Sequence, residues 1–157
     1  MSDDREAVKA FARGMTSPPA RRVLVTEDDP ALRRLLATAI RRGGVELQTA
    51  VDGEEALNRL VEREWLVLVL DMMMPKVSGW DVIGWLAKHP ERKPKTVIVV
   101  SAADRALLKK LDPSVVNAII FKPLDVFQLA AYVKSACDLH HQDRRRKRLV
   151  SEAHAVE

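Results

Sequence analysis

Short apolar runs alternate regularly with longer segments of helical spacing from residue 21 onward. The five apolar runs lie at residues 23–25, 45–50, 66–70, 96–100 and 118–121. The five segments with helical spacing lie at residues 31–41, 54–63, 80–88, 105–111 and 124–139. Strands that alternate with helices are typical of α/β domains, in which each helix returns the chain to the next parallel strand. The pattern therefore predicts a doubly wound sheet of five parallel strands with five helices.

The polarity of each run predicts where its strand lies in the sheet. Residues 66–70 are all apolar until the run stops at Asp71, and residues 96–100 are apolar after Thr96. Central strands of a parallel sheet are covered by helices on both faces, so they carry few polar side chains. Residues 45–50 alternate more and include Glu46 and Gln48, which indicates a strand at the edge of the sheet.

The two ends of the chain differ from the regular part between them. Residues 3–13 have the composition of a short helix, but Gly14 and the sequence TSPP at residues 16–19 interrupt it. We therefore expect an N-terminal extension over residues 1–20, partly helical or disordered, and one domain over residues 21–139. Residues 140–157 are expected to form a basic tail or an extension of the last helix.

The composition narrows the class of protein. The chain has 157 residues, of which 47% are hydrophobic, and this suits one globular domain. Its apolar runs fall far short of the roughly 20 residues that a membrane-spanning helix needs. The first six residues lack the apolar core of a signal peptide, and the single cysteine, Cys137, has no partner for an internal disulfide. A cytoplasmic protein without a membrane anchor is the simplest interpretation.

The net charge of +4 includes one local concentration of basic residues. It consists of Arg144, Arg145, Arg146, Lys147 and Arg148. Such a run can bind nucleic acid or an acidic partner through its charge. A solvated extension of the last helix explains it at least as well, so both interpretations stay open.

Polar side chains follow four of the five predicted strands. They are Glu27, Asp28 and Asp29 after the first run, Asp71 after the third, Ser101 after the fourth and Lys122 after the fifth. Ligands of open α/β sheets bind beyond the carboxyl ends of the strands, so we expect these side chains to converge. Clustered acids raise one another's proton affinity, and Mg²⁺, which prefers carboxylate and phosphate oxygens, relieves that cost. A carboxylate beside such a metal can attack a phosphoryl group, while a lysine and a hydroxyl stabilise the product.

Each of these residues also has an ordinary structural explanation. Asp28 or Asp29, just before Pro30, suits the N-cap of a helix. Lys122 suits an exposed surface position. Asp71 is harder to explain in this way, because burial of a carboxylate without a partner is costly. Only the joint occurrence of these residues favours a functional site.

The same residues carry a resemblance to the receiver domains of two-component response regulators. The sequence VLVTEDDPALR at residues 23–33 resembles the opening of that family, and AVDGEEAL at 50–57 resembles the entry into its second helix. The phosphorylation loop of the family is similar to LDMMMP at 70–75 with Gly79, and its last two motifs are similar to VVSA at 99–102 and FKPL at 121–124. Five motifs in the family order make this resemblance specific. It implies the flavodoxin-like strand order 2-1-3-4-5.

The resemblance assigns a role to each position. Asp71 would be the phosphoacceptor, Ser101 would hydrogen-bond the phosphoryl group, and Lys122 would pair with it. The protein ligands of Mg²⁺ would be Glu27, Asp28, Asp71 and the backbone carbonyl of Met73. The phosphoryl donor would be a sensor histidine kinase or a histidine phosphotransfer protein. The chain would thus be a signalling protein that catalyses only its own phosphotransfer and dephosphorylation.

The output of the signal is less constrained than the chemistry. Ile119 occupies the switch position, where the family often has a Tyr or Phe that responds to Ser101. We expect a stand-alone receiver that signals by docking to another protein, and dimerisation on phosphorylation is an open question. One alternative is a pseudo-receiver that binds proteins without phosphorylation, and another is nucleic-acid or acidic-partner binding through residues 144–148. An aspartate nucleophile of the haloacid-dehalogenase type is set aside, because Met73 stands where that class needs a second Asp.

Overall fold

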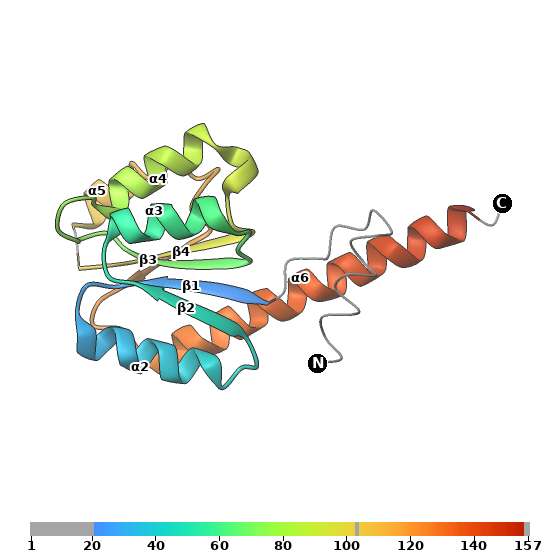
Figure 1. Cartoon of the computed structure of the whole chain (residues 1–157), viewed down its shortest axis with the longest axis horizontal. Coiled ribbons are helices and arrows are strands. Elements are labelled where there is room, and N and C mark those ends of the chain that lie inside the picture. The colour runs from blue at the N-terminus through green and yellow to red at the C-terminus, as the bar shows by residue number, and fades with distance from the viewer. Residues whose placement is uncertain (1–20, 103, 156–157) are drawn as a thin grey trace.

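The computed structural model describes residues 21–102 and 104–155, and Figure 1 shows its elements with the labels used below. Five strands form a single sheet. They are β1 (Arg22–Thr26), β2 (Glu46–Ala50), β3 (Val67–Asp71), β4 (Thr96–Ser101) and β5 (Ala118–Phe121). All neighbouring strands are parallel, and their order is β2-β1-β3-β4-β5. The predicted doubly wound sheet and its strand order are therefore confirmed.

The middle of the sheet is its most apolar part. Every residue of β3 is buried, and every residue of β4 after Thr96 is buried too. β2 lies at one edge and exposes Glu46. The strand positions predicted from the polarity of the runs are thus confirmed for all three strands.

Helices cover both faces of the sheet. α2 (Pro30–Arg41) and α6 (Val126–Ala155) lie against one face, and α3 (Gly53–Glu62) and α4 (Gly79–Lys88) lie against the other (Figure 1). The short elements α5 (Arg105–Leu108) and η1 (Pro90–Arg92) complete the described part. The fold is a three-layer arrangement of helices, sheet and helices.

β3 contributes to the hydrophobic core on both sides, because successive side chains of a strand point to opposite faces. Leu68 and Leu70 pack in the cluster that contains the buried residues of α3 and α4. Val67 and Val69 pack in the cluster that contains the buried residues of α2 and α6. Each such burial contributes roughly 1.5–3 kcal/mol. The two packed layers hold β3, and with it Asp71 at its end, in a fixed position.

The fourth helix is shorter than predicted. The segment at 105–111 forms only the single turn α5, and the N–H of Leu111 then donates to the carbonyl of Leu108, three residues back. Asp112 and Pro113 follow. A proline disfavours the helical conformation of the residue before it, so the helix has no room to lengthen.

Of the two forms expected for residues 140–157, the structure shows the extension of the last helix. α6 continues past residue 139 to Ala155, and the part beyond residue 139 extends away from the sheet (Figure 1). The basic run at 144–148 is therefore helical. The first half of α6 is anchored in the core by three buried side chains, Leu129, Val133 and Cys137.

The expected helix at 3–13 and the rest of the N-terminal extension lie outside the described residues. Among the helices of residues 21–102 and 104–155, none is long and apolar enough to pass through a lipid bilayer.

Candidate functional site

Three carboxylates meet at the carboxyl end of the sheet. Glu27 and Asp28 directly follow β1, and Asp71 is the last residue of β3. β1 and β3 are neighbours in a register that pairs Thr26 with Leu70, so the next residue of each strand falls at the same level. Carboxylate oxygens of the three residues lie within 4.8 Å of one another. The predicted convergence of these acids is therefore present.

Asp29 and Asp28 have different tasks. Asp29 is the N-cap of α2, and its Oδ1 accepts hydrogen bonds from the N–H groups of Ala31 at 2.9 Å and Leu32 at 3.4 Å. A cap of this kind typically contributes about 1 kcal/mol to helix stability. Asp28, which is exposed, is thereby free to face the other two carboxylates.

The acidic cluster is short of positive charge. Glu27 is 1% exposed and Asp71 is 2% exposed. The pKa of Glu27 is raised to about 7, first by burial and then by the charge of Asp71, and Lys122 only partly opposes these two effects. Two buried carboxylates beside a single lysine are not neutralised. A divalent cation would supply the missing charge.

Lys122 brings its ammonium group between the two buried acids. Its Nζ lies 3.3 Å from Oδ2 of Asp71 and 3.3 Å from both carboxylate oxygens of Glu27. Burial acts to lower the pKa of Lys122, but the carboxylates of Asp71 and Glu27 outweigh it, so the pKa lies above its usual value. The lysine therefore stays charged and fixes the direction of both carboxylates.

Ser101 and Lys122 are positioned by the pairing of β4 with β5. Ser101 is the last residue of β4 and is fully buried, and its carbonyl accepts a hydrogen bond of 3.0 Å from the backbone N–H of Lys122. Ile119 lies within β5, opposite Val99, and is 37% exposed. The hydroxyl and the lysine thus come from adjacent strand ends, whereas Ile119 lies further back along β5 and belongs to the outer surface.

The loop from β3 to α4 is held tightly against the end of β3. Oδ1 of Asp71 accepts a hydrogen bond of 3.1 Å from the N–H of Met73. The N–H of Gly79 donates to the carbonyl of Met72 at 3.1 Å. A Cβ at Gly79 would lie only 2.6 Å from Cα of Met72 and 2.7 Å from the carbonyl oxygen of Asp71. This position therefore needs glycine, and the loop holds the N–H of Met73 beside the carboxylate of Asp71.

Arg33 is a positioning residue that the sequence did not single out. Its Nη1 donates to the backbone carbonyls of Glu27 at 2.9 Å and Asp28 at 3.3 Å. It thereby ties the acidic turn after β1 to the first turn of α2. The sequence did contain a signal for this role: Arg33 lies one turn into the helix that follows the acidic pair.

The donor set fits a hard divalent cation. Carboxylate oxygens and a backbone carbonyl are the ligands that Mg²⁺ takes in proteins, and it usually keeps several waters besides. The three carboxylates and the carbonyl of Met73 are of this type. The shortage of positive charge around Glu27 is consistent with such an ion. The predicted Mg²⁺ set is therefore chemically coherent.

Comparison with known proteins gives a consistent picture. The family model described as the response regulator receiver domain matches residues 23–134. The chain is 26% identical over 116 residues to Protein PilG of Pseudomonas aeruginosa, which covers 73% of the chain and 85% of PilG. It is 34% identical over 120 residues to the phosphate regulon transcriptional regulatory protein PhoB of Rhizobium meliloti, covering 73% of the chain and 51% of PhoB. The chain thus spans about half the length of the transcriptional regulators of this type that it matches.

Solved structures agree with the fold. The receiver domain of the Francisella response regulator 1452 superimposes with a TM-score of 0.69 at 26% identity, covering 76% of the chain and 98% of that domain. The response regulator TrrA of Thermotoga maritima, solved with Mg²⁺ and BeF, superimposes with a TM-score of 0.64 at 28% identity, covering 74% of the chain and 98% of TrrA. Together with the family match over residues 23–134, this shows that the chain belongs to the response regulator receiver domains of two-component systems.

Proposed function

We propose that Asp71 accepts a phosphoryl group from a phosphohistidine of a sensor histidine kinase or a histidine phosphotransfer protein. The observation that carries this proposal is the meeting of three carboxylates within 4.8 Å, with Nζ of Lys122 3.3 Å from Oδ2 of Asp71. A carboxylate oxygen of Asp71 would form the new P–O bond as the P–N bond to the donor histidine breaks. The electron pair of the broken bond would stay with the imidazole nitrogen.

The side chains around Asp71 would divide the work of the transfer. Glu27, Asp28, Asp71 and the carbonyl of Met73 would hold Mg²⁺, which when bound offsets negative charge on the phosphoryl oxygens. Lys122 would pair with a phosphoryl oxygen after the transfer. The hydroxyl of Ser101 would donate a hydrogen bond to another phosphoryl oxygen.

The test is direct phosphorylation by a small donor. The full chain is incubated with acetyl phosphate and Mg²⁺, and its intact mass is compared with that of Asp71→Asn. We expect one added phosphoryl group on the parent and none on the variant. A parent chain that gains no phosphoryl mass would instead support the pseudo-receiver, which keeps the fold as a binding module.

We further propose that phosphorylation changes a docking surface for another protein. Ser101 at the end of β4 and Ile119 on β5 would sense the phosphoryl group, with isoleucine in place of the aromatic switch residue. Hydrogen exchange of β5 amides, measured with and without beryllium fluoride and Mg²⁺, tests this coupling. We expect the exchange rates of these amides to change in the parent and to stay the same in Asp71→Asn. Unchanged rates in both proteins would contradict the proposed coupling. The stand-alone arrangement and the cytoplasmic location stay predictions.

A further inference from the structure

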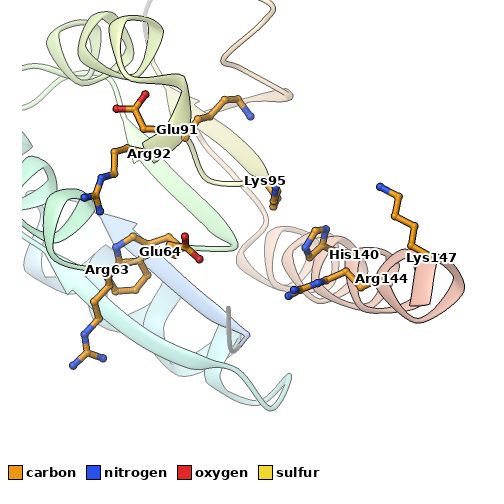
Figure 2. Close-up of a pocket in the computed structure, with 10 residues that line it drawn as sticks. Arg63, Glu64, Glu91, Arg92, Lys95, His140, Arg144 and Lys147 are labelled. Carbon is orange, nitrogen blue, oxygen red and sulfur yellow. The ribbon is translucent and has the colours of Figure 1, made fainter. Parts of the chain in front are cut away.

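A second charged site lies at the opposite, amino-terminal end of the sheet. A cavity of about 340 Å³ opens there between three segments: residues 63–65 just before β3, residues 91–95 just before β4, and the second half of α6. Figure 2 shows that Arg144 and His140 of α6 lie across the cavity from Glu64 and Arg92, with Lys95 between them. The volume falls in the lower part of the range of small-ligand sites, roughly 300–1,000 Å³.

The lining of this cavity is strongly basic. Six cations face two carboxylates, those of Glu64 and Glu91. The cations are Arg63, Arg92, Lys93, Lys95, Arg144 and Lys147. Cations gathered from separate segments repel one another, so the arrangement costs free energy unless an anion or solvent compensates it.

Two of the six cations form ion pairs: Arg63 pairs with Glu46 at 3.3 Å, and Lys147 pairs with Asp143 at 3.6 Å. Arg92 and Lys93 donate only to neutral oxygens. The side chains of Lys95 and Arg144 form no ion pair or hydrogen bond with any residue in 21–102 or 104–155. Both are nevertheless directed to the same cavity (Figure 2).

His140 adds an unpartnered polar atom between them. Its Nε2 is buried and has no hydrogen-bond partner among the described residues. A buried nitrogen without a partner is unfavourable, because it has lost its contact with water and gained no hydrogen bond in exchange. Burial lowers the pKa of His140, and so do the positive charges of Lys95, Arg144 and Lys147. Asp143 only partly opposes these effects. The lining therefore offers both uncompensated charge and an unused hydrogen-bonding group.

We propose that this cavity binds a compact polyphosphate, either inorganic or the diphosphate of a small organic molecule. Lys95 and Arg144 would contact the phosphate oxygens directly, and Nε2 of His140 would donate to one of them. Two adjacent phosphates match cations that face each other across a concave site, and arginine in particular binds phosphate through two parallel hydrogen bonds. The inference goes beyond the proposed phosphoryl transfer and does not depend on it, because Asp71 lies at the other end of β3.

The shape and charge of the cavity favour a small ligand over nucleic acid. Nucleic-acid grooves follow an extended backbone and often present aromatic rings on which bases stack. Here Trp65, which lines the cavity, is only 4% exposed, and its Nε1 donates to the carbonyl of Arg59. Glu64 and Glu91 are exposed in the lining and would repel a phosphate chain that continued past it. A diphosphate can bind between the cations without approaching both acids.

The test is calorimetric titration of the full chain with pyrophosphate in magnesium-free buffer at fixed ionic strength. We expect saturable binding to one site. Lys95→Ala and Arg144→Ala should each weaken the affinity about tenfold, since a charge-assisted hydrogen bond is worth about 1.5–3 kcal/mol. Arg145→Ala is the matched control, because it removes an adjacent arginine of α6 that does not line the cavity, and its affinity should stay within twofold of the parent.

Two further measurements keep the test decisive. The imidazole resonances of His140, assigned with His140→Gln, should shift on saturation with pyrophosphate in the parent. Adenosine diphosphate is titrated in parallel: equal affinity indicates that the diphosphate unit suffices, and tighter binding indicates an organic ligand, and either result supports the site. The proposal is overturned if pyrophosphate does not saturate one site, or if Arg145→Ala weakens binding as much as Arg144→Ala. Tighter binding of duplex DNA than of either diphosphate would overturn it in favour of nucleic acid.

Discussion

The carboxyl and amino ends of the sheet carry charge clusters of opposite sign, and the two clusters are built differently. At the carboxyl end, Glu27 and Asp71 are almost completely buried and stand directly at the ends of neighbouring strands. At the amino end, the cations are exposed or half-buried and stand on loops and on a projecting helix. Water screens the basic cluster far more effectively than it screens the acidic one.

The two ends are therefore suited to different ligands. The acidic end is rigid at Glu27 and Asp71, because strand register, the N–H of Met73 and the ion pairs of Lys122 fix these two carboxylates. A rigid set of oxygens within a few ångströms suits one small, hard cation. The basic end is wider and its long side chains adapt, which suits a larger anion. Four substitutions test this contrast between the two ends of the sheet.

The largest effect is expected from loss of an acid at the carboxyl end. In the parent, Mg²⁺ at 100 times its Kd should stabilise the fold by about 2.7 kcal/mol. Asp28→Asn removes one carboxylate of the cluster, so we expect a Mg²⁺ affinity about 100-fold lower and little stabilisation at the same concentration. Thermal unfolding with and without Mg²⁺ measures this. Asp29→Asn is the control, since asparagine also caps helices well and the residue lies outside the cluster. Equal Mg²⁺ effects in the two variants would contradict the assignment.

The next effect tests the rigidity of the acidic end. Gly79→Ala should destabilise the fold by about 1–3 kcal/mol, because its Cβ would overlap the backbone of Met72 and Asp71. Gly84→Ala, in the same helix, has nothing within 4 Å of the new Cβ and should stabilise by about 0.5–1 kcal/mol. Urea denaturation measures both. Similar changes in both variants would show that the loop is not constrained at Gly79.

A smaller effect is expected when the support of the acidic turn is removed. Arg33→Ala deletes the hydrogen bonds to the carbonyls of Glu27 and Asp28, so the Mg²⁺ affinity should fall about tenfold, as it does when supporting groups of metal sites are lost. Arg34→Ala is the matched control, because within residues 21–102 and 104–155 the Arg34 side chain donates only to the carbonyl of Pro30 in its own helix. Calorimetry with Mg²⁺ separates the two variants. An unchanged affinity in Arg33→Ala would mean that the strand ends position the acids without help.

The smallest effect is expected across the sheet. β3 has five residues, so the two ends are separated by about 17 Å of strand, about twice the Debye length in physiological salt. Lys95→Ala should therefore change the Mg²⁺ affinity less than twofold, whereas Lys122→Met, at the acidic end, should change it clearly. A large effect of Lys95→Ala on Mg²⁺ binding would show that the two clusters are coupled.

Much of the fold was predictable because it depends on the polarity of residues that are close together in the sequence. The apolar runs ended where β3 and β4 end, and their polarity indicated the central and edge strands correctly. The acids, the hydroxyl and the lysine followed from the rule that parallel strands present their carboxyl ends together. The length of α5 was not predicted, because a tighter turn, in which the N–H of Leu111 donates to the carbonyl of Leu108, follows it. For residues 140–157 the sequence left a tail and a helix extension open, since helical spacing does not define where an exposed helix ends.

The order of polar and apolar side chains along the chain was enough to indicate that five strands alternate with helices and that Glu27, Asp28, Asp71 and Lys122 follow strand ends. These features depend on side-chain polarity at fixed spacing, which is a local property. The three-dimensional packing was needed to show that Asp29 rather than Asp28 caps α2, and that Arg33 supports the acidic turn. It alone brought Lys95 and Arg144 to one cavity, because α6 is held against the sheet by its buried residues and its second half is thereby directed past the start of β4.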